Sequence, residues 1–433
     1  MAIKLGRARP VAGLAALAAC GLLAAACGSS GGSSSSGSSS SASASSAASS
    51  PSTATAASLG TPHPASGSPV VFGLLNLLSG PVTFPEISEA EQAAAAYANE
   101  YLDGIGGHPI KIVVCATDGQ PATSERCANQ LLNQHPVAIL GGGDTGSSGA
   151  IPVWQRANLA YLGGIPFTPV ESNYKNAVIF DDVSIADNAA ASVYGAKTLG
   201  AKTAAIIYTS DTQGTAVADN VIAPVMKNVG YTKVTKIPVP PTATDVTSAV
   251  AAAISTHPDV VYIDDPNSCP QVLSSLKQLG STAKVLGIDP CTSPAAIAAA
   301  NGGASGMYYS SPVEAPDAGT TQSNLYLAVL KKYAPKSIPV DSLTAMGFAT
   351  VMNVQAALAK FTPAELTTAK ILAAFRSGSD HPNFMAHPYT CNGTQLAGAT
   401  AVCNAYQQIR QVQGTKIIVA DPSWVTAGAY YKG

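Results

Sequence analysis

Short β-rich runs alternate with longer helical segments along most of this chain, and this alternation restricts the fold more than any other feature. In a first series, strands are expected at 70–77, 110–116, 137–142 and 160–164, with helices at 85–102 and 124–133. In a second series, strands at 203–209, 232–239, 260–265 and 284–289 alternate with helices at 216–229, 245–255 and 270–280. Strands that alternate with helices of this length form right-handed βαβ units and parallel sheets. The sequence therefore predicts an α/β protein with two doubly wound parallel-sheet lobes.

The N-terminal segment has the pattern of an export signal. Three Lys and Arg residues in the first nine positions precede an apolar stretch over 11–26. The junction resembles the signal of bacterial lipoproteins, in which a cysteine becomes the acylated N-terminus. Cys27 is the expected lipidation site because it directly meets a Ser/Gly tract, and Cys20 is the alternative. An uncleaved membrane anchor is a second interpretation, and either one leaves the body outside the membrane.

Residues 28–68 form a low-complexity tract of Ser, Ala, Gly, Thr and Pro. Such a composition cannot bury enough apolar surface to fold, so we expect a disordered tether, with the body starting near Pro69. The rest of the chain is longer than one core usually accommodates, which again favours two lobes. Without the three signal cations, the formal net charge of −2 becomes about −5. A mildly acidic body without a basic cluster argues against nucleic-acid binding.

Six cysteines follow the signal, and an even number in an exported chain indicates disulfides. Six cysteines allow fifteen pairings, of which the simplest joins neighbours in sequence. These pairs are Cys115 with Cys127, Cys269 with Cys291, and Cys391 with Cys403. A zinc site would need C-x-x-C or Cys/His spacing, which the sequence lacks. His381 and His387 are interpreted as unrelated surface residues, so no metal is expected.

Polar residues gather in the loops that follow the expected strands. In open parallel sheets a ligand binds beyond the carboxyl ends of the strands, where each loop enters the next helix. The loops in question are rich in Ser, Thr, Asp and Gly; they cover 78–86, 141–149, 165–172, 209–214, 264–269 and 289–294. This pattern predicts a site for a small polar ligand.

Several segments, taken in order, resemble one known family. The stretch "LSGPVTFPEISEAEQAAAAYANEYLDGIGGHPIKIVV" has an L-S-G-P loop, an Ala-rich helix and a glycine turn before a strand, and "DGQPATSERCANQLL" follows. Further matches are "ILGGGDTGSS", "GIPFTP", "SDTQG" and "QIRQVQGTKIIV". This order is similar to that of type I periplasmic binding proteins of the leucine/isoleucine/valine-binding group, over nearly the whole body.

The resemblance implies a fold and a role. The family has two α/β lobes joined by three hinge crossings, with a ligand enclosed between them. The first lobe is then expected over 69–181 with about 310–385, and the second over 182–309 with about 386–433. Members deliver small molecules, typically amino acids, to ABC importers, and in Gram-positive bacteria they are lipid-anchored. We therefore expect a monomer without a cofactor, anchored to the outer face of the cell membrane, with ABC permease subunits as partners.

The stretch "AILGGGDTGSSGA" contains G-x-G-x-x-G, the pattern of a dinucleotide loop. Its position argues against that function, because it follows the third expected strand, Asp144 would repel a pyrophosphate, and Glu171 lies beyond the next strand. The same geometry suits a smaller anion, since helix N-terminal N–H groups and the hydroxyls of Ser147 and Ser148 can donate to a carboxylate. The resemblance implies this use. A tight turn with surface serines is the alternative.

The resemblance implies three more ligand-binding residues in the first lobe. The loop with Phe167 and Thr168 corresponds to one that supplies a carbonyl and a hydroxyl, although the family usually has a small residue at the position of Phe167. Phe84 corresponds to an aromatic residue that closes over the ligand. The alternative for Phe84 is packing within its own loop.

In the second lobe, Gln213 replaces a tyrosine of the family, and an acidic residue is expected to bind the ligand's ammonium group. Asp289 is the first candidate, and Asp264 or Asp265 the next. Each of these acids has the alternative role of capping a helix. Because of the departures from the family pattern, the expected ligand is a small polar metabolite with a carboxylate or amide.

Two other classes of protein compete with this interpretation. A secreted hydrolase is disfavoured because the sequence lacks G-x-S-x-G, H-E-x-x-H and a P-loop lysine, and no histidine lies in the expected strand-end loops. An extracellular sensor that signals to a receptor or kinase would share the ligand-binding half. The sequence does not separate sensing from transport.

Overall fold

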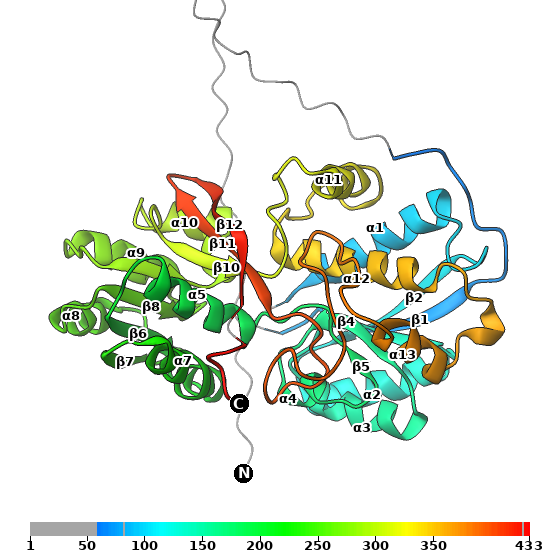
Figure 1. Ribbon diagram of the computed structural model, residues 1–433, viewed down its shortest axis with the longest axis horizontal. Helices are drawn as coiled ribbons and strands as arrows, with labels where there is room; N and C mark the ends of the chain where they lie inside the picture. Colours follow the sequence, from blue (N-terminus) through cyan, green and yellow to red (C-terminus); the bar gives the residue numbers. More distant parts are fainter. Residues whose placement is uncertain (1–58, 81–82, 427) are drawn as a thin grey trace, which may run out of the picture. The chain divides into compact units, whose positions relative to one another are not determined.

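The computed structural model describes residues 59–80, 83–426 and 428–433. The expected signal, Cys20, Cys27 and residues 28–58 of the expected tether lie outside this part. Among the described residues, no helix has both the length and the apolar character needed to span a bilayer. The described chain forms two sheets, each with helices on both faces, so the predicted α/β fold class with two lobes is confirmed (Figure 1).

The first sheet has the strand order β2-β1-β3-β4-β5, and its neighbouring strands are parallel. The strands are β1 (Val70–Leu77), β2 (Ile110–Thr117), β3 (Ala138–Gly143), β4 (Tyr161–Ile165) and β5 (Ala177–Val178). One face is covered by α1 (Pro85–Tyr101), α11 (Thr321–Tyr333), α12 (Ser342–Leu358) and α13 (Thr368–Arg376). The other face carries α2 (Pro121–Leu132) and α3 (Ser147–Ala157), and the short α4 (Pro169–Ser172) follows β4.

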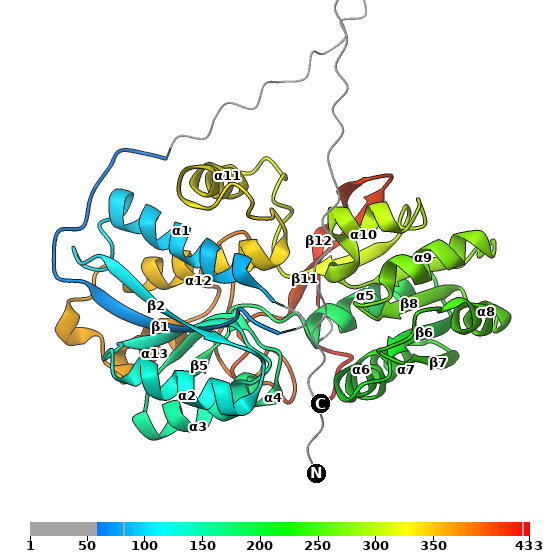
Figure 2. The same cartoon turned by 180° about the vertical axis from the view of Figure 1, so that it is seen from behind.

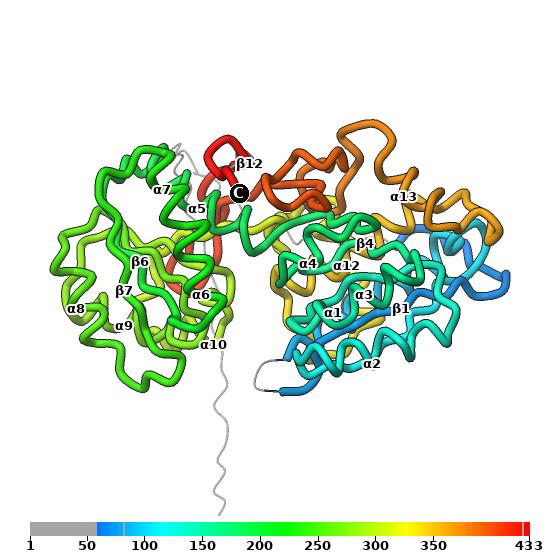
Figure 3. The backbone as a smooth tube through the Cα atoms, turned by 90° about the horizontal axis from the view of Figure 1, so that it is seen from below, coloured from blue at the N-terminus to red at the C-terminus, as the bar shows by residue number. Residues whose placement is uncertain are grey.

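The second sheet has the order β12-β11-β10-β9-β8-β6-β7. Its parallel strands are β6 (Thr203–Thr209), β7 (Lys233–Val239), β8 (Val260–Asp264), β9 (Lys284–Gly287) and β10 (Tyr308–Ser311). The last two strands, β11 (Tyr406–Gln413) and β12 (Lys416–Thr426), are antiparallel. Its helices are α5 (Ala186–Lys197), α6 (Thr212–Val217), α7 (Ala223–Val229), α8 (Thr247–Ser255), α9 (Cys269–Gln278) and α10 (Pro294–Ala299) (Figure 2). The end of the chain returns to this lobe, where β12 lies beside α5 (Figure 3).

Strands β1, β3, β4 and β5 of the first sheet are buried on both faces, as expected for a parallel sheet between helices, whereas the edge strand β2 is mostly half-buried. Phe72 and Leu74 of β1 belong to the apolar cluster under α1 and α12, whereas Leu75 belongs to the cluster under α2 and α3. On that second face the buried Trp154 stacks on Tyr161, with ring centroids 5.7 Å apart. This packing holds the second half of α3 against the start of β4.

The three consecutive glycines lie inside β3, so the alternative interpretation of a tight turn at these positions is wrong. At Gly141 and Gly142, the close approach of neighbouring backbones explains why no side chain is present. A Cβ atom on Gly142 would lie 2.2 Å from the Leu75 carbonyl oxygen, and one on Gly141 would lie 2.7 Å from Cα of Gly164. Side chains at these positions would separate β3 from both neighbours.

In the described part of the chain, three segments run between the two sheets: residues 179–185 after β5, 312–320 after β10, and 403–405 before β11. Two of them are tied together by Asp181. Its Oδ1 accepts hydrogen bonds from Nδ2 of Asn404 at 2.9 Å and Nδ2 of Asn383 at 3.1 Å. Burial raises the pKa of Asp181 to about 7, against the lowering effect of these two amides.

The ordered body begins earlier than Pro69, which corrects the expected end of the tether. Residues from Leu59 onward lie along the first lobe without regular secondary structure. Tyr97 Oη donates to the Leu59 carbonyl at 3.3 Å, and the backbone N–H groups of His63 and Ala65 donate to carbonyls at the end of α1, both at 2.9 Å. Backbone hydrogen bonds hold this segment, and the composition that suggested disorder does not reveal them.

The predicted cysteine pairs are confirmed: the described residues contain the disulfides Cys115–Cys127, Cys269–Cys291 and Cys391–Cys403. The second of these joins the start of α9 to the turn after β9, so it links two loops at the carboxyl edge of the second sheet. The third lies beside a crossing, where the Cys403 backbone N–H donates to the Ile179 carbonyl at 2.8 Å.

Candidate functional site

Asp144 organises the loop between β3 and α3. Its Oδ1 accepts from Thr117 Oγ1 at 2.8 Å and from the Gly146 backbone N–H at 3.2 Å, while Oδ2 accepts from Ser124 Oγ at 2.7 Å. The side chain is only 3% exposed. Asp144 therefore connects the ends of β2 and β3 with α2, a structural role that the sequence analysis missed.

Four side chains next to this loop form a continuous hydrogen-bonded chain, which we call the hydroxyl chain: Ser147, Thr168, Glu171 and Tyr161. The Ser147 and Thr168 hydroxyl oxygens are 2.7 Å apart, and Thr168 Oγ1 lies 3.2 Å from Glu171 Oε2. The Thr168 backbone N–H donates to the same Oε2 at 3.0 Å, and Tyr161 Oη donates to Oε1 at 3.1 Å. Thr168 and Glu171 thus form a capping box at the start of α4.

Two predicted ligand-binding residues, Ser147 and Thr168, are brought together by this chain. Thr168 is half-buried, whereas Ser147 is 2% exposed and its hydroxyl group has no further hydrogen-bond partner among the described residues. Ser148 is exposed and forms no side-chain hydrogen bond within the described part. From the sequence, Glu171 entered only as an acidic residue too far along the chain to serve a dinucleotide loop. The capping-box spacing "TPVE" was the signal that could have placed it beside Thr168.

Glu171 is almost fully buried and acidic groups surround it. Burial raises the pKa of Glu171 to about 8, which outweighs the hydrogen bonds from Thr168 and Tyr161, and the charge of Asp144 raises it further. Tyr161 is itself buried, and burial together with Glu171 raises its pKa well above the usual value. The hydroxyl chain therefore ends on a carboxyl group that changes charge near neutral pH.

Phe84 and Phe167 stack beside the hydroxyl chain. Their ring centroids are 5.4 Å apart with an interplanar angle of 24°, and both side chains are half-buried. Asn76 Nδ2 donates to the Phe84 carbonyl at 2.7 Å and so holds the loop at the end of β1. A Cβ on Gly143 would lie 3.0 Å from the Phe167 ring, so glycine leaves room for this pair. Phe84 and Phe167, predicted separately, form one aromatic surface.

At the edge of the second sheet, Asp264 ends β8 and is buried. Its Oδ2 has no hydrogen-bond partner among the described residues, and burial raises its pKa to about 7, with Asp265 and Asp211 adding to the effect. Asp265 Oδ1 accepts from the backbone N–H groups of Asn267 and Ser268, which is a turn-capping role, but its Oδ2 also has no partner among the described residues. Asp264 is the more accessible of the two, with 8% of its surface exposed against 1% for Asp265.

Asp289 lies in the turn after β9 and is partly exposed. Its backbone carbonyl and Oδ1 accept from Thr292 Oγ1 at 2.6 and 3.2 Å. Burial raises the pKa of Asp289, and the positive charge of Arg410 opposes that effect. Arg410 is itself 2% exposed and donates to Ser342 Oγ at 3.3 Å and to the Val313 carbonyl. Asp289 and Arg410 thus place opposite charges where the β10 crossing leaves the second sheet.

Gln213 is exposed on the first turn of α6, and its side chain forms no hydrogen bond with another described residue. The preceding Asp211 caps that helix by accepting from the Gly214 backbone N–H at 2.7 Å. The predicted ligand-binding role of Gln213 stays a prediction.

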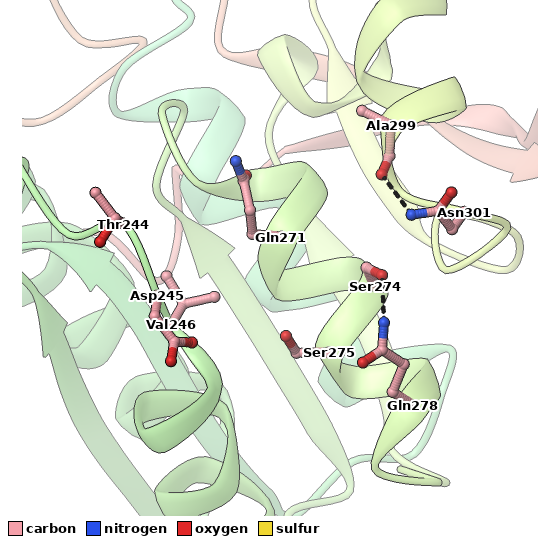
Figure 4. Close-up of a pocket in the computed structure, with 9 residues that line it drawn as sticks. All are labelled: Thr244, Asp245, Val246, Gln271, Ser274, Ser275, Gln278, Ala299 and Asn301. Atoms are coloured by element: carbon pink, nitrogen blue, oxygen red, sulfur yellow. Dashed lines mark hydrogen bonds between the residues drawn. The ribbon is translucent and has the colours of Figure 1, made fainter.

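A cavity of about 260 Å³ on the second lobe includes none of the predicted site residues. Figure 4 shows that residues at the N-terminus of α8, along α9 and at the end of α10 line it. Gln278 Nε2 and Ser274 Oγ, two of these residues, are already bonded to each other at 3.0 Å. This cavity lies apart from the strand-end loops.

No cluster of three or more potential metal-ligating side chains occurs within the described residues. The two histidines that the sequence analysis examined stack on aromatic rings: His381 on Tyr389 and His387 on Tyr406, with centroids 5.1 and 3.8 Å apart. Both side chains are half-buried, which differs from the expected surface position, and His381 Nε2 is buried without a hydrogen-bond partner among the described residues.

Comparison with known proteins identifies the family. A family model described as periplasmic binding protein matches residues 69–406. The chain therefore belongs to the periplasmic binding protein family, and the predicted resemblance is confirmed. No significant match is found among curated protein sequences.

Solved structures share the fold at low identity. The leucine binding protein LivK of Thermotoga maritima MSB8 has a TM-score of 0.65 at 15% identity, covering 82% of this chain and 99% of its own. A fatty acid ABC transporter substrate-binding protein of Thermomonospora curvata has a TM-score of 0.68 at 18% identity, and the match covers 87% of this chain and 97% of that protein. An ABC transporter solute-binding protein of R. palustris in complex with 4-hydroxybenzoate has a TM-score of 0.68 at 17% identity, and the match covers 83% of this chain and 97% of that protein. The general role of a solute-binding protein fits this fold.

Proposed function

We propose that this protein is a non-enzymatic, extracellular substrate-binding protein of an ABC importer, and that its ligand is a small polar molecule with a carboxylate or amide. The observation that carries the proposal is the pairing of Ser147 and Thr168, with hydroxyl oxygens 2.7 Å apart, beside the Phe84–Phe167 surface. Solved structures of the same fold hold ligands of related chemistry, namely isoleucine and 4-hydroxybenzoate.

The two sheet edges offer complementary chemistry. In the first lobe, the Ser147 and Thr168 hydroxyls and the N–H groups of the first turn of α3 can bind a carboxylate or a carbonyl oxygen. In the second lobe, the unpartnered Oδ2 of Asp264 and the partly exposed Asp289 can accept from an ammonium or amide N–H group. The aromatic pair supplies apolar area for the ligand's body.

Binding and release would follow from the crossings between the lobes. Ligand first contacts one lobe, rotation at the crossing segments brings the other lobe onto it, and a permease recognises the closed form. Acylation at Cys27 would keep the protein at the outer face of the membrane, since two acyl chains suffice for stable anchoring. This is the part of the proposal that concerns residues outside the described structure.

A ligand screen tests the proposal. The full chain is heated with L-isoleucine, 4-hydroxybenzoate, small aliphatic carboxylates and amides, and its melting temperature is recorded. A ligand at about 100 times its dissociation constant adds roughly 2.7 kcal/mol of stability, which gives a measurable rise. Ser147→Ala should weaken binding of a carboxylate about tenfold or more, because it removes a hydrogen bond to a charged group.

The control is Ser337→Ala, an exposed serine in the loop after α11 that forms no side-chain hydrogen bond within the described residues. It should bind as the wild type does. A folded protein that gives no saturable response to any member of the panel, or that chemically converts one, would contradict the proposed function.

A further inference from the structure

The hydroxyl chain has a direction, because each hydroxyl group carries one proton and donates one hydrogen bond. When Glu171 is ionised, both of its oxygens only accept. Thr168 then donates from Oγ1 to Glu171 Oε2, 3.2 Å away, and Ser147 donates to Thr168 across 2.7 Å. The Ser147 proton is then engaged in the hydrogen bond to Thr168, so only the lone pairs of Ser147 Oγ remain for a ligand.

Protonation of Glu171 reverses the chain. Tyr161 Oη continues to donate to Oε1 at 3.1 Å, and the Thr168 backbone N–H continues to donate to Oε2 at 3.0 Å. A protonated Oε2 keeps a lone pair for that N–H group and can direct its proton at Thr168 Oγ1, 3.2 Å away. Thr168 then accepts from Glu171 and donates to Ser147, whose own proton becomes free for a ligand. Among the described residues, no group other than Thr168 forms a hydrogen bond with the Ser147 hydroxyl that could set the direction of its proton.

We infer that Glu171 is a positioning residue that sets the hydrogen-bond polarity of the ligand site: the Ser147–Thr168 pair offers an acceptor when Glu171 is ionised and a donor when it is protonated. The inference deepens the proposed function and rests on it for its consequence, because it makes Glu171 a determinant of which ligand chemistry binds. Glu171 itself is 1% exposed and acts only through Thr168.

The surroundings of Glu171 place the change of polarity near neutral pH. Tyr161 faces it from β4 and Asp144 from the loop after β3; the buried Glu91 of α1 acts on Tyr161. These groups supply no positive charge, and burial raises the pKa of Glu171 to about 8. Tyr161 stays protonated throughout this range, since its own pKa is raised well above the usual value.

The ligand classes then respond to pH in opposite ways. A carboxylate needs a donor and is repelled by a second negative charge, so it binds the form with protonated Glu171. Its affinity should fall about tenfold for each pH unit above 8, because the competent form is depleted at that rate. A ligand that presents an N–H group to Ser147 should bind more tightly over the same range.

Neutron diffraction tests the inference without a ligand, because it locates deuterium atoms that X-ray diffraction at ordinary resolution does not show. Crystals of the full chain are measured at about pD 6.5 and about pD 9.5. At the lower value we expect deuterium on Glu171 Oε2, directed at Thr168, and the Ser147 deuterium directed away from Thr168. At the higher value Glu171 should carry none, and the Ser147 deuterium should lie between Ser147 and Thr168.

The matched variant is Glu171→Gln. Its amide oxygen takes the position that faces the Thr168 backbone N–H, because an amide NH2 group cannot accept from that N–H, and it accepts from Thr168 Oγ1 as an ionised glutamate does. The variant should therefore keep the high-pD arrangement at both values. Glu171 is also titrated in solution by carboxyl ¹³C NMR of the full wild-type chain, which does not depend on how the variant folds. A midpoint between about 7 and 9 supports the inference. The same Ser147 orientation at both pD values, or a midpoint below about 6, would overturn it.

These readouts are independent of the ligand screen. If the direction of the hydrogen bonds changes with pD but no ligand in the screen raises the melting temperature, the hydroxyl chain behaves as inferred and the proposed function fails. If a ligand binds with one Ser147 orientation at all pD values, the proposed function stands and the role of Glu171 is only that of a helix cap.

Discussion

Asp181 makes the stability of the crossing region depend on pH. It lies after β5, is 4% exposed, and accepts hydrogen bonds from Asn383 and Asn404. Its pKa rises from 3.8 to about 7 because of burial. A buried acid with a raised pKa binds its proton more tightly in the folded state. Its contribution to stability is therefore full below pH 4 and is lost as the pH rises through about 7.

The magnitude follows from the two pKa values. At about 1.4 kcal/mol for each pH unit between 3.8 and about 7, the free energy of unfolding should fall by about 4 kcal/mol relative to a variant that does not titrate. Asp181→Asn is that variant, because its amide oxygen can still accept from Asn383 and Asn404. The difference in stability between wild type and variant should shift by this amount, in favour of the variant, between pH 4 and 8.

Urea denaturation followed by circular dichroism at intervals across this range measures the difference. Asp317→Asn, the same charge change at an exposed position without a side-chain hydrogen bond in the described structure, is the control, and its curve should run parallel to that of the wild type. Parallel curves for wild type and Asp181→Asn would refute the reasoning, because they would mean that Asp181 titrates equally in the folded and unfolded chain.

Two further predictions concern the supports of the site. Replacing Cys269 and Cys291 together by serine removes the disulfide that closes a loop of sequence separation 22, which should lower the free energy of unfolding by about 3 kcal/mol. Ligand binding should also weaken, because this disulfide joins two loops at the sheet edge. An unchanged denaturation midpoint would contradict this prediction. Gly142→Ala should cost about 3 kcal/mol or more, because the new Cβ would meet the Leu75 carbonyl oxygen at 2.2 Å. A folded Gly142→Ala variant with wild-type stability would show that β1 and β3 can separate freely.

Much of the fold was predictable because its signals are local. Apolar runs, helical periodicity and the spacing of the cysteines each depend on a few consecutive residues, and they correctly gave the α/β class, both lobes and the three disulfides. Backbone bonds to distant residues are not local, so the ordered segment from Leu59 was assigned to the tether. For the same reason the glycines of β3 were read as a loop feature when neighbouring strands explain them.

The site was predictable only in part. The loops after β3 and β4 were named from the sequence, with Ser147 and Thr168 in them. Their 2.7 Å contact depends on the parallel register of β3 and β4. The roles of the buried acidic residues were the part of the site that the sequence did not predict. Asp144 was read as a repelling charge, whereas the structure gives it three donors.

The sequence by itself determined which segments become strands and helices, and therefore that polar loops collect at the carboxyl edges of two sheets. Tertiary structure alone decided which side chains those edges bring into contact and in what electrostatic surroundings. The physical reason is that hydrophobic periodicity acts over a few residues. The groups that act on Glu171 come instead from the loop after β3, from β4 and from the start of α4, and only the folded chain brings them together and buries them.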